Sequence, residues 1–106
     1  MITLSIRYTI DPAKLGDFEA YAAGLPDAAE RCGARGVQYF LPTKFAGPTN
    51  SALALIDFPS LAAYEQYRAA LASDAKAGEL ARRADQSGCI LVEDRAILRR
   101  VAPAAG

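Results

Sequence analysis

The chain repeats one pattern twice, in which a strand leads directly into the first turn of a helix. In the first copy, apolar and polar residues alternate over Ile2–Ile10, and Asp11 and Pro12 then supply a helix N-cap and a first helical position. In the second copy, the apolar segment 50–58 is followed by a Pro-Ser break, and Ser60 is again a good N-cap. Two such units in 106 residues predict a single α+β domain.

The segments between and after these units supply two further strands and the bodies of the helices. After Pro12, apolar residues recur at helical spacing over about twenty residues and predict a helix. We expect this helix to be kinked at Pro26 and to end at Gly33. Pro42 cannot donate a hydrogen bond to a sheet, so the second strand is expected at an edge. The expected strands are 2–10, 36–45, 50–58 and 89–101, and the expected helices are 12–33, 61–72 and 75–86.

The order of these elements is βαββαβ, which is typical of a ferredoxin-like α+β sandwich. We expect an antiparallel four-stranded sheet with the first and third strands in the centre and the other two at the edges. Right-handed crossover connections then place the helices on one face of the sheet. The domain is expected to span residues 1–102, followed by a disordered tail at 103–106.

The helices leave the other face of this sheet open, although three of the strands are apolar on both faces. Leu55 alternates with Ile56 in the third strand, and Phe40 alternates with Tyr39 in the second. A soluble monomer rarely exposes an apolar patch of that size. We therefore expect a twofold homodimer in which two sheets pack by their open faces into a dimeric α/β barrel, burying about 800 Å² or more on each partner.

Composition and motifs exclude several classes of partner. Twelve basic and twelve acidic residues cancel, and the arginines are scattered, so nucleic acid is not an expected partner. No apolar run is long enough to span a membrane, and the first residues alternate in polarity, unlike a signal peptide, so no membrane partner is expected. Cys32 and Cys89 form no metal or redox motif, and we expect them to be reduced thiols in the cytoplasm.

The lack of histidine in the sequence is the strongest constraint on chemistry. It removes the commonest general base, the commonest metal ligand and the usual axial ligand of haem. Phosphate-binding loops, dinucleotide-binding glycine patterns and nucleophile elbows are also missing from the sequence. We therefore expect neither a metal nor a cofactor.

Three polar side chains are candidates for catalysis in the cleft between the sheet and its dimer partner. Arg7 lies on the strand face opposite Leu4, so it is expected to point into the cleft, where it could bind a carboxylate or an enolate. Glu93 could act as a general base with a raised pKa, and Tyr39 could reach toward Arg7 and polarise a carbonyl group. The expected ligand-binding residues around them are Asp57, Arg95, Phe40 and Leu55.

Each of these residues also has a structural interpretation that the sequence leaves open. Arg7 could form an ion pair with Asp57 or Glu93 where the two sheets meet. Glu93 and Arg95 could form cross-strand pairs that protect an exposed edge. Tyr67 has ordinary core spacing on its helix, and its hydroxyl is expected to reach the surface.

Four local strings, taken together, resemble the NIPSNAP family of small bacterial proteins: IRYTIDPAKLGDFEAYA, YFLP, NSALALIDFPSLAAYEQYR and EDRAILRRV. The resemblance covers nearly the whole chain and implies a ferredoxin-like fold assembled as a dimeric α/β barrel. It implies no particular reaction, since none is common to the bacterial members. The wider group of such barrels includes cofactor-free monooxygenases, haem-degrading enzymes and stress-response proteins. After YFLP, close relatives tend to carry an acidic or His-containing turn, whereas this chain reads TKFAGPT, so a catalytic histidine contributed by that turn would be missing here.

The leading hypothesis is therefore a NIPSNAP-type dimer that binds a small, partly apolar molecule in the cleft, or in a small pocket left between the sheet and the helices. One alternative is a cofactor-free enzyme, such as a monooxygenase, isomerase or cyclase, acting on an activated carbonyl compound. Because the chain lacks histidine and metal, its substrate would need an acidic C–H bond. A second alternative is a non-catalytic assembly module in which the charges only fix the dimer.

Overall fold

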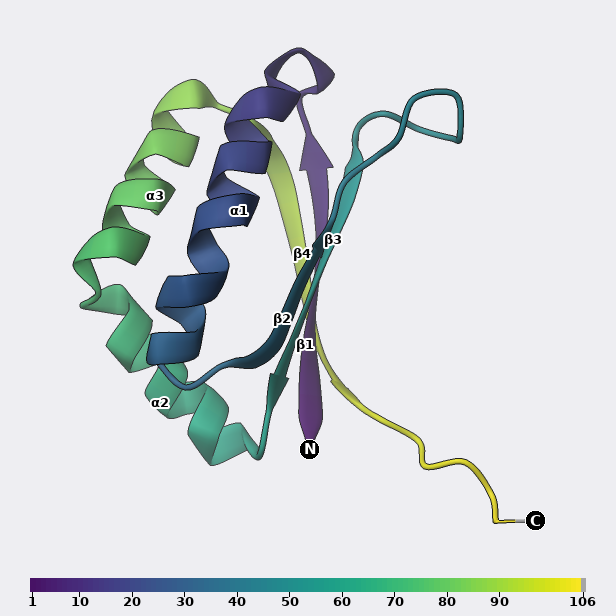
Figure 1. The fold of residues 1–106 in the computed structure, drawn as a ribbon, viewed down its shortest axis with the longest axis vertical. Coiled ribbons are helices and arrows are strands. Elements are labelled where there is room, and N and C mark those ends of the chain that lie inside the picture. The colour runs from purple at the N-terminus through teal and green to yellow at the C-terminus, as the bar shows by residue number, and fades with distance from the viewer. Residues whose placement is uncertain (106) are drawn as a thin grey trace.

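The computed structural model describes residues 1–105, and its elements follow the predicted order (Figure 1). Residue 106, the last of the predicted disordered tail, lies outside the described residues. The strands are β1 (Ile2–Ile10), β2 (Arg35–Phe40), β3 (Ser51–Phe58) and β4 (Ile90–Arg99). The helices are a single 3-10 turn, η1 (Pro12–Lys14), followed by α1 (Leu15–Arg31), α2 (Leu61–Ala72) and α3 (Ala75–Ser87).

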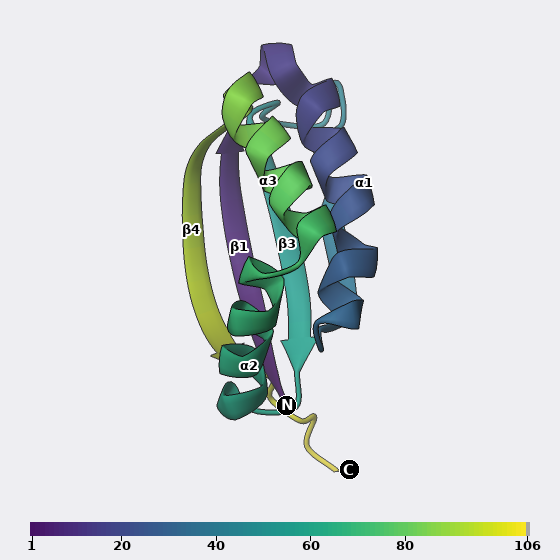
Figure 2. The same cartoon turned by 90° about the vertical axis from the view of Figure 1, so that its left-hand side faces the viewer.

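The four strands form one antiparallel sheet in the order β2-β3-β1-β4, which confirms the ferredoxin-like arrangement. All the helices lie on one face of this sheet, as Figure 1 shows. In Figure 2, α1 and α3 run side by side over the sheet and α2 lies at one end, while β4 lies beside this layer and is left largely uncovered. The sheet therefore has one covered face, one open face and an exposed edge strand.

Side chains at the ends of the helices explain where the helices begin and end. The Ser60 hydroxyl accepts a hydrogen bond from the backbone N–H of Ala63 at 3.1 Å, and Asp74 accepts one from Ala77 at 2.9 Å. Gly88 ends α3 in the left-handed conformation with φ of 69°, where a side chain would be strained. The helix break between α2 and α3 thus follows from an N-cap at the start of α3.

The second strand is shorter than predicted. It ends at Phe40 rather than near residue 45, and residues 41–50 form a loop that projects from the body of the molecule (Figure 1). Pro42 lacks the N–H group needed for sheet pairing, and the backbone turns at Phe45 and Gly47, which both have positive φ angles. The proline that marks an edge strand therefore also ends that strand.

The hydrophobic core lies between the covered face and the helices. Phe18 of α1 and Phe58 of β3 are completely buried, and the Phe58 ring lies 4.8 Å from the Tyr67 ring by centroids. α1 and α3 pack closely because Gly24 has no side chain: a Cβ there would lie 3.0 Å from a methyl carbon of Leu80. The covered face thus contributes large side chains, while the helix–helix contact uses a small one.

A β-bulge interrupts the regular pairing of β1 with β4. Thr9 pairs with Val92, but the next residue of β1 skips one position of β4. Ile10 pairs with Ile90, which leaves Leu91 as an extra, exposed residue. Because of this extra residue, the odd-numbered positions beyond the bulge face the helices on the same side as Ile90. Strict alternation along β4 would place Ile90 and these positions on opposite faces, and the bulge is the reason that it does not hold.

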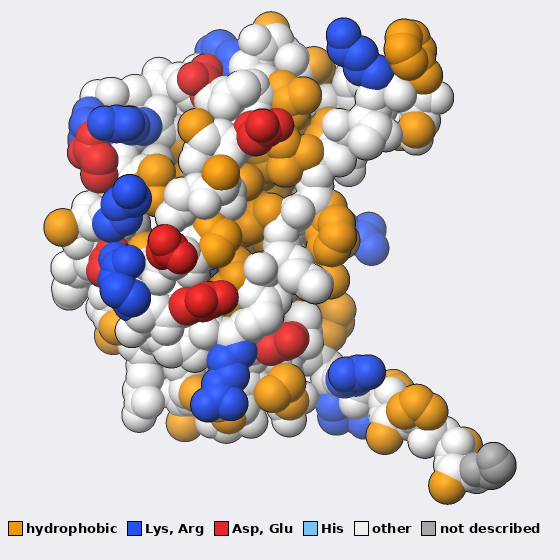
Figure 3. Space-filling model, viewed as in Figure 1, with side chains coloured by type: hydrophobic (Ala, Val, Ile, Leu, Met, Phe, Trp, Pro, Cys, Tyr) orange, Lys and Arg blue, Asp and Glu red, His pale blue; other side chains and the backbone are white. Residues whose placement is uncertain are grey.

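The open face of the sheet carries apolar side chains at positions that the register defines. Phe40, Val92 and Leu98 are about half exposed, at 48%, 47% and 52%. Figure 3 shows this side as a recess between the projecting 41–50 loop and the projecting C-terminal tail. Other members of the open face are Thr3, Ser5, Arg7, Thr9, Gln38, Leu53, Leu55, Asp57, Asp94 and Ala96. An apolar sheet face with rims at both ends is thus exposed in the single chain.

Candidate functional site

A cavity of about 110 Å³ lies between the covered face of the sheet and the helices. We call it the tyrosine cavity. Its remaining walls are aliphatic side chains from β1, β3, α1 and α2. The polar side chains that line it are four tyrosines and two arginines, namely Tyr8, Tyr21, Tyr39, Tyr67, Arg68 and Arg95.

The tyrosines come from four different elements. Strand alternation turns Tyr8 of β1 toward the helices, and it is only 2% exposed. Tyr39 of β2 stacks against it with ring centroids 6.2 Å apart, and their hydroxyl oxygens are 3.4 Å apart, within hydrogen-bonding distance. Tyr21 of α1 meets Tyr39 edge to face at 6.4 Å, and Tyr67 of α2 is 3% exposed. The phenols are therefore held by the packing of both layers.

Two charged residues of β4 lie on the same face of the sheet as this cluster. Glu93 is the cross-strand neighbour of Tyr8, and Arg95 is the neighbour of Ile6. The Arg95 guanidinium donates a hydrogen bond to the Glu93 carboxylate at 3.0 Å. Arg68 approaches from α2 and donates to the Tyr64 hydroxyl at 3.2 Å. The cavity thus has one ion-paired guanidinium and one whose partner is a phenol.

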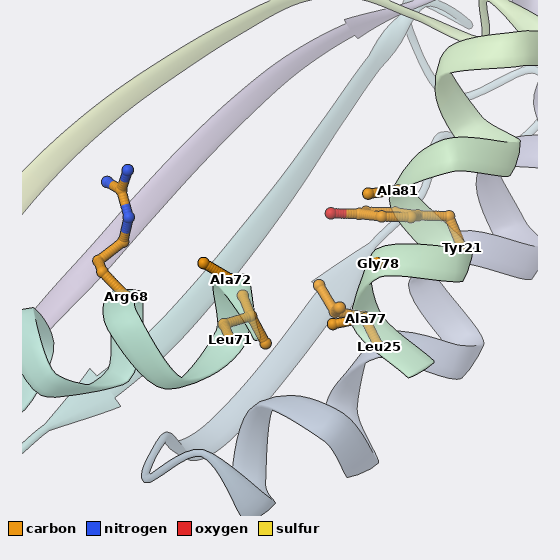
Figure 4. A pocket seen from close by; sticks show the side chains of 8 residues that line it. All are labelled: Tyr21, Leu25, Arg68, Leu71, Ala72, Ala77, Gly78 and Ala81. Atoms are coloured by element: carbon orange, nitrogen blue, oxygen red, sulfur yellow. The ribbon is translucent and has the colours of Figure 1, made fainter. Parts of the chain in front are cut away.

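A larger, more open pocket of about 360 Å³ adjoins the tyrosine cavity, and we call it the outer pocket. It lies among the three helices at the break between α2 and α3 and is lined by small side chains such as Ala81. Tyr21, Leu25, Arg68 and Leu71 line both spaces. In Figure 4 the Arg68 side chain rises from α2, and the Tyr21 hydroxyl points toward the side where Arg68 lies. The outer pocket therefore shares four wall residues, one of them a phenol, with the tyrosine cavity.

The surroundings of these side chains set their protonation. Burial raises the pKa of Tyr8, Tyr21, Tyr39 and Tyr67 above the ordinary tyrosine value of 10.0, so all four phenols keep their protons at neutral pH. Burial opposes the charge of Arg95, but the hydrogen bond and charge of Glu93 outweigh it, and the pKa of Arg95 is raised. The cavity therefore offers neutral hydrogen-bond donors beside a permanent cation.

The structure separates residues that the sequence analysis had grouped as one catalytic site. Arg7 lies on the open face, opposite Asp94 of β4, whereas Tyr39 and Glu93 lie on the covered face. Successive residues of a strand point to opposite faces, so the sheet itself stands between Arg7 and Tyr39. The prediction that the Tyr39 hydroxyl reaches toward Arg7 is wrong, because that hydroxyl meets Tyr8.

The ion pairs predicted for Arg7 are not formed within residues 1–105 either. Asp57 accepts a hydrogen bond from the Thr3 hydroxyl at 2.7 Å, and Glu93 is paired with Arg95. No carboxylate oxygen in the described part of the chain lies within 4.0 Å of the Arg7 guanidinium. Arg7 is an exposed cation on a face where the cross-strand residue is Asp94.

The predicted ligand-binding residues divide in the same way. Phe40, Leu55 and Asp57 lie on the open face, and only Arg95 lies at the tyrosine cavity. A shallow hollow of about 430 Å³ on the open face is lined by Arg7, Leu55 and neighbouring residues of β1 and β3. This hollow lies where the sequence predicts a cleft against a dimer partner.

Sequence reasoning missed Tyr8, Tyr21 and Arg68 and misjudged Tyr67, whose hydroxyl was expected at the surface. Tyr8 carried a usable signal, because it shares its strand face with Ile6 and Ile10.

Within residues 1–105, no three His, Cys, Asp or Glu side chains gather as a set of metal ligands. In the same residues, no helix combines the length and apolar character needed to cross a membrane.

A four-stranded antiparallel sheet with helices on one face defines a ferredoxin-like α+β protein, here with a small phenol-lined cavity between the two layers. The chain belongs to the NIPSNAP family, whose family model matches residues 4–104. Nearly the whole described chain therefore lies inside the family domain.

Solved structures share this fold. An uncharacterized NIPSNAP-like domain protein from Burkholderia xenovorans has a TM-score of 0.77 and 21% identity, covering 99% of this chain and 89% of that one. A NIPSNAP family protein from Agrobacterium tumefaciens has a TM-score of 0.76 and 19% identity, with coverage of 94% and 92%. A proposed antibiotic biosynthesis monooxygenase from Bordetella bronchiseptica has a TM-score of 0.72 and 16% identity, with coverage of 95% and 97%. No curated protein matches the chain.

Proposed function

We propose that this protein is a homodimeric α/β barrel that binds a small, partly apolar molecule in the tyrosine cavity of each subunit. The observation that carries the proposal is the cavity itself, in which aliphatic walls surround four protonated phenols and two guanidinium groups. Ligand sites typically combine such apolar walls with a few convergent polar groups. Of the two locations that the sequence suggests, this is the small pocket between the sheet and the helices and not the cleft against a dimer partner.

The open face supports the dimer part of the proposal. Phe40, Val92 and Leu98 are half exposed on one sheet face. In aqueous solution, such an apolar surface is expected to pack against another protein surface. A second copy is the simplest cover, since a twofold axis pairs the same face with itself. We expect about 800 Å² buried on each partner. The two free cysteines, Cys32 and Cys89, favour a reducing cytoplasm as the place where the dimer works.

Native mass spectrometry of protein purified from its own host tests the binding proposal. We expect a dimer that carries a reproducible extra mass. Ala81→Phe narrows the outer pocket and should reduce the bound fraction, whereas Ala70→Phe, an exposed change on α2 away from both spaces, should not. A clean dimer in every preparation, with no bound mass, would count against a ligand site.

A matched pair of variants tests the dimer separately. Leu55→Lys places a charge on the open face and should give a monomer, because an unpaired charge buried between two sheets is costly. Leu61→Lys adds the same charge at an exposed position of α2 and should leave the dimer intact. Analytical ultracentrifugation distinguishes the two states, and a Leu55→Lys dimer would contradict the assigned interface.

A second candidate function is that of a cofactor-free enzyme acting on an activated carbonyl compound. Glu93 is the cross-strand neighbour of Tyr8 and could accept a proton from an acidic C–H bond, leaving an enolate whose oxygen accepts a hydrogen bond from Tyr8 or Tyr39. The similarity in fold to the Bordetella bronchiseptica protein is consistent with such chemistry. Glu93→Gln should then abolish turnover of a bound compound while leaving it bound. If the dimer binds no ligand at all, the non-catalytic assembly module is the better reading.

A further inference from the structure

The geometry points to a planar organic anion, with its oxyanion held by Arg95 and the phenols, as the ligand of the tyrosine cavity, and to Arg68 as the cation at its mouth. This inference rests on the proposed binding function and specifies its ligand class. It follows from three features of the cavity: the balance of charge, the supply of hydrogen-bond donors, and the shape of the walls.

The charge of the lining is positive. Two guanidinium groups, those of Arg68 and Arg95, line the tyrosine cavity, and no aspartate or glutamate of the described chain is among the residues that line it or the outer pocket. Glu93 is the carboxylate paired with Arg95, at 3.0 Å. Arg68 donates to the neutral phenol of Tyr64, so its charge is not cancelled there. One positive charge is therefore available to an incoming anion.

The phenols add donors rather than charge. Tyr8 and Tyr39 have their hydroxyl oxygens 3.4 Å apart, so one can donate to the other while the second donates to a ligand oxygen. Tyr21 directs its hydroxyl toward the side where Arg68 lies (Figure 4). Preorganised hydroxyl donors around a cation are the arrangement that stabilises an oxyanion, such as a carboxylate, phenolate or enolate.

The walls favour a flat, apolar body attached to that oxyanion. The rings of Tyr8 and Tyr39 are stacked at 27°, and Tyr21 stands perpendicular to Tyr39 at 89°. Leu25 and Leu71 line both this space and the outer pocket. A cavity of about 110 Å³ is of the same order as the apolar cavity of about 150 Å³ that holds a benzene ring. A ring that carries an oxyanion is larger than benzene, so such a ligand would occupy the inner space together with part of the adjoining outer pocket of about 360 Å³.

Three probes of similar shape separate charge from fit: benzoate, benzamide and benzylammonium. Binding to the full-length dimer is measured by titration with NMR detection of the tyrosine rings. We expect benzoate to bind about 10-fold to 100-fold more tightly than benzamide, the range for a charge-assisted hydrogen bond. We expect benzylammonium to bind more weakly still, because its charge has the same sign as the lining.

Arg68 is tested with a matched control. Arg68→Gln should weaken benzoate about 10-fold and leave benzamide unchanged, since the substitution removes charge at the mouth but keeps a polar side chain. Arg82→Gln removes the same charge from α3, where Arg82 bonds to Glu79 and lines neither space, and should change neither affinity. For Arg95, the double change Glu93→Gln and Arg95→Gln avoids an unpaired carboxylate and should also remove the preference for benzoate.

The outcomes separate this inference from the proposed function. Equal binding of benzoate and benzamide, with shifts confined to the cavity tyrosines, would overturn the anion assignment while leaving the cavity as a ligand site. Tighter binding of benzylammonium would overturn it as well. If none of the three probes shifts the cavity tyrosines at any concentration, both the anion assignment and the proposed binding function fail.

Discussion

The buried phenols predict that this protein loses stability steeply in alkali. Burial raises the pKa of Tyr8, Tyr21 and Tyr39 far above 10.0, so these groups stay protonated in the folded chain at pH values where the unfolded chain has lost the protons. Their contribution to stability is fully present below about pH 10, the unfolded-state pKa, and is lost as the pH rises above it. Each phenol should therefore release one proton when the chain unfolds in alkali.

The size of the effect follows from linkage. At about pH 11, one unit above the unfolded-state pKa, each protonated phenol lowers the free energy of unfolding by about 1.4 kcal/mol. The three phenols of Tyr8, Tyr21 and Tyr39 together remove about 4 kcal/mol, and the slope steepens toward about 4 kcal/mol for each further pH unit. Domains of this size have only about 5–15 kcal/mol in total, so the protein should unfold before pH 13 or so.

Urea unfolding between about pH 8 and pH 11 measures this slope, and the near-ultraviolet absorbance of phenolate reports the titration directly. Tyr21→Phe keeps the ring but removes one hydroxyl, so its loss of stability over the same range should be about 1.4 kcal/mol smaller than that of the wild type. The reasoning is refuted if Tyr21→Phe shows the same pH slope as the wild type, or if every phenol ionises near pH 10 while the chain remains folded.

Three further predictions concern the scaffold. Gly78→Ala should raise the free energy of unfolding by about 0.5–1 kcal/mol, because Gly78 lies within α3 with open space around it. Gly24→Ala should not raise it, because the added Cβ would meet the packed side chain of Leu80. Thermal unfolding of the two variants compares these effects. Phe18→Ala should cost about 3–5 kcal/mol in urea unfolding, since Phe18 is completely buried, and a loss below about 1 kcal/mol would contradict the assigned core. A hydrogen bond from the Ala77 N–H and the Arg31 side chain lower the pKa of Asp74 below 3.8. The contribution of Asp74 to the free energy of unfolding is therefore present above that value and is lost as the pH falls. Asp74→Asn should keep the N-cap of α3 but make stability less dependent on pH in acid, which urea unfolding at several pH values measures.

The fold was predictable because local signals agreed with one another. The alternation over Ile2–Ile10, the N-caps Ser60 and Asp11, and the break at Asp74 each matched the observed elements, and the order of elements then left few topologies. The end of β2 was placed too late, because Val, Tyr, Phe and Leu continue a strand-like pattern up to Pro42 and nothing in that pattern marks the last paired residue.

The site was only partly predictable, since it is assembled by contacts between distant elements. Glu93, Arg95 and Tyr39 were identified as candidates and lie at the tyrosine cavity or beside it. Arg7 was assigned correctly to the open face, but Tyr39 was treated as if it could reach across the sheet to it. Alternation fixes which residues share a face within one strand, and only the pairing register relates the faces of two strands.

Because of the extra residue at the β1–β4 bulge, the effect of losing or gaining one residue in β4 depends on where in the strand the change falls. Removing Leu91 would convert the bulge into regular pairing while Ile90 stays opposite Ile10 and Val92 stays opposite Thr9. An insertion between Val92 and Asp94 would instead shift the rest of the strand by one position and place Asp94 opposite Ile6, on the helix side, where Arg95 now lies. Related chains that differ by one residue in β4 could therefore carry identical side chains and still present opposite charges to the cavity, which makes the spacing of this strand as important to ligand choice as its composition.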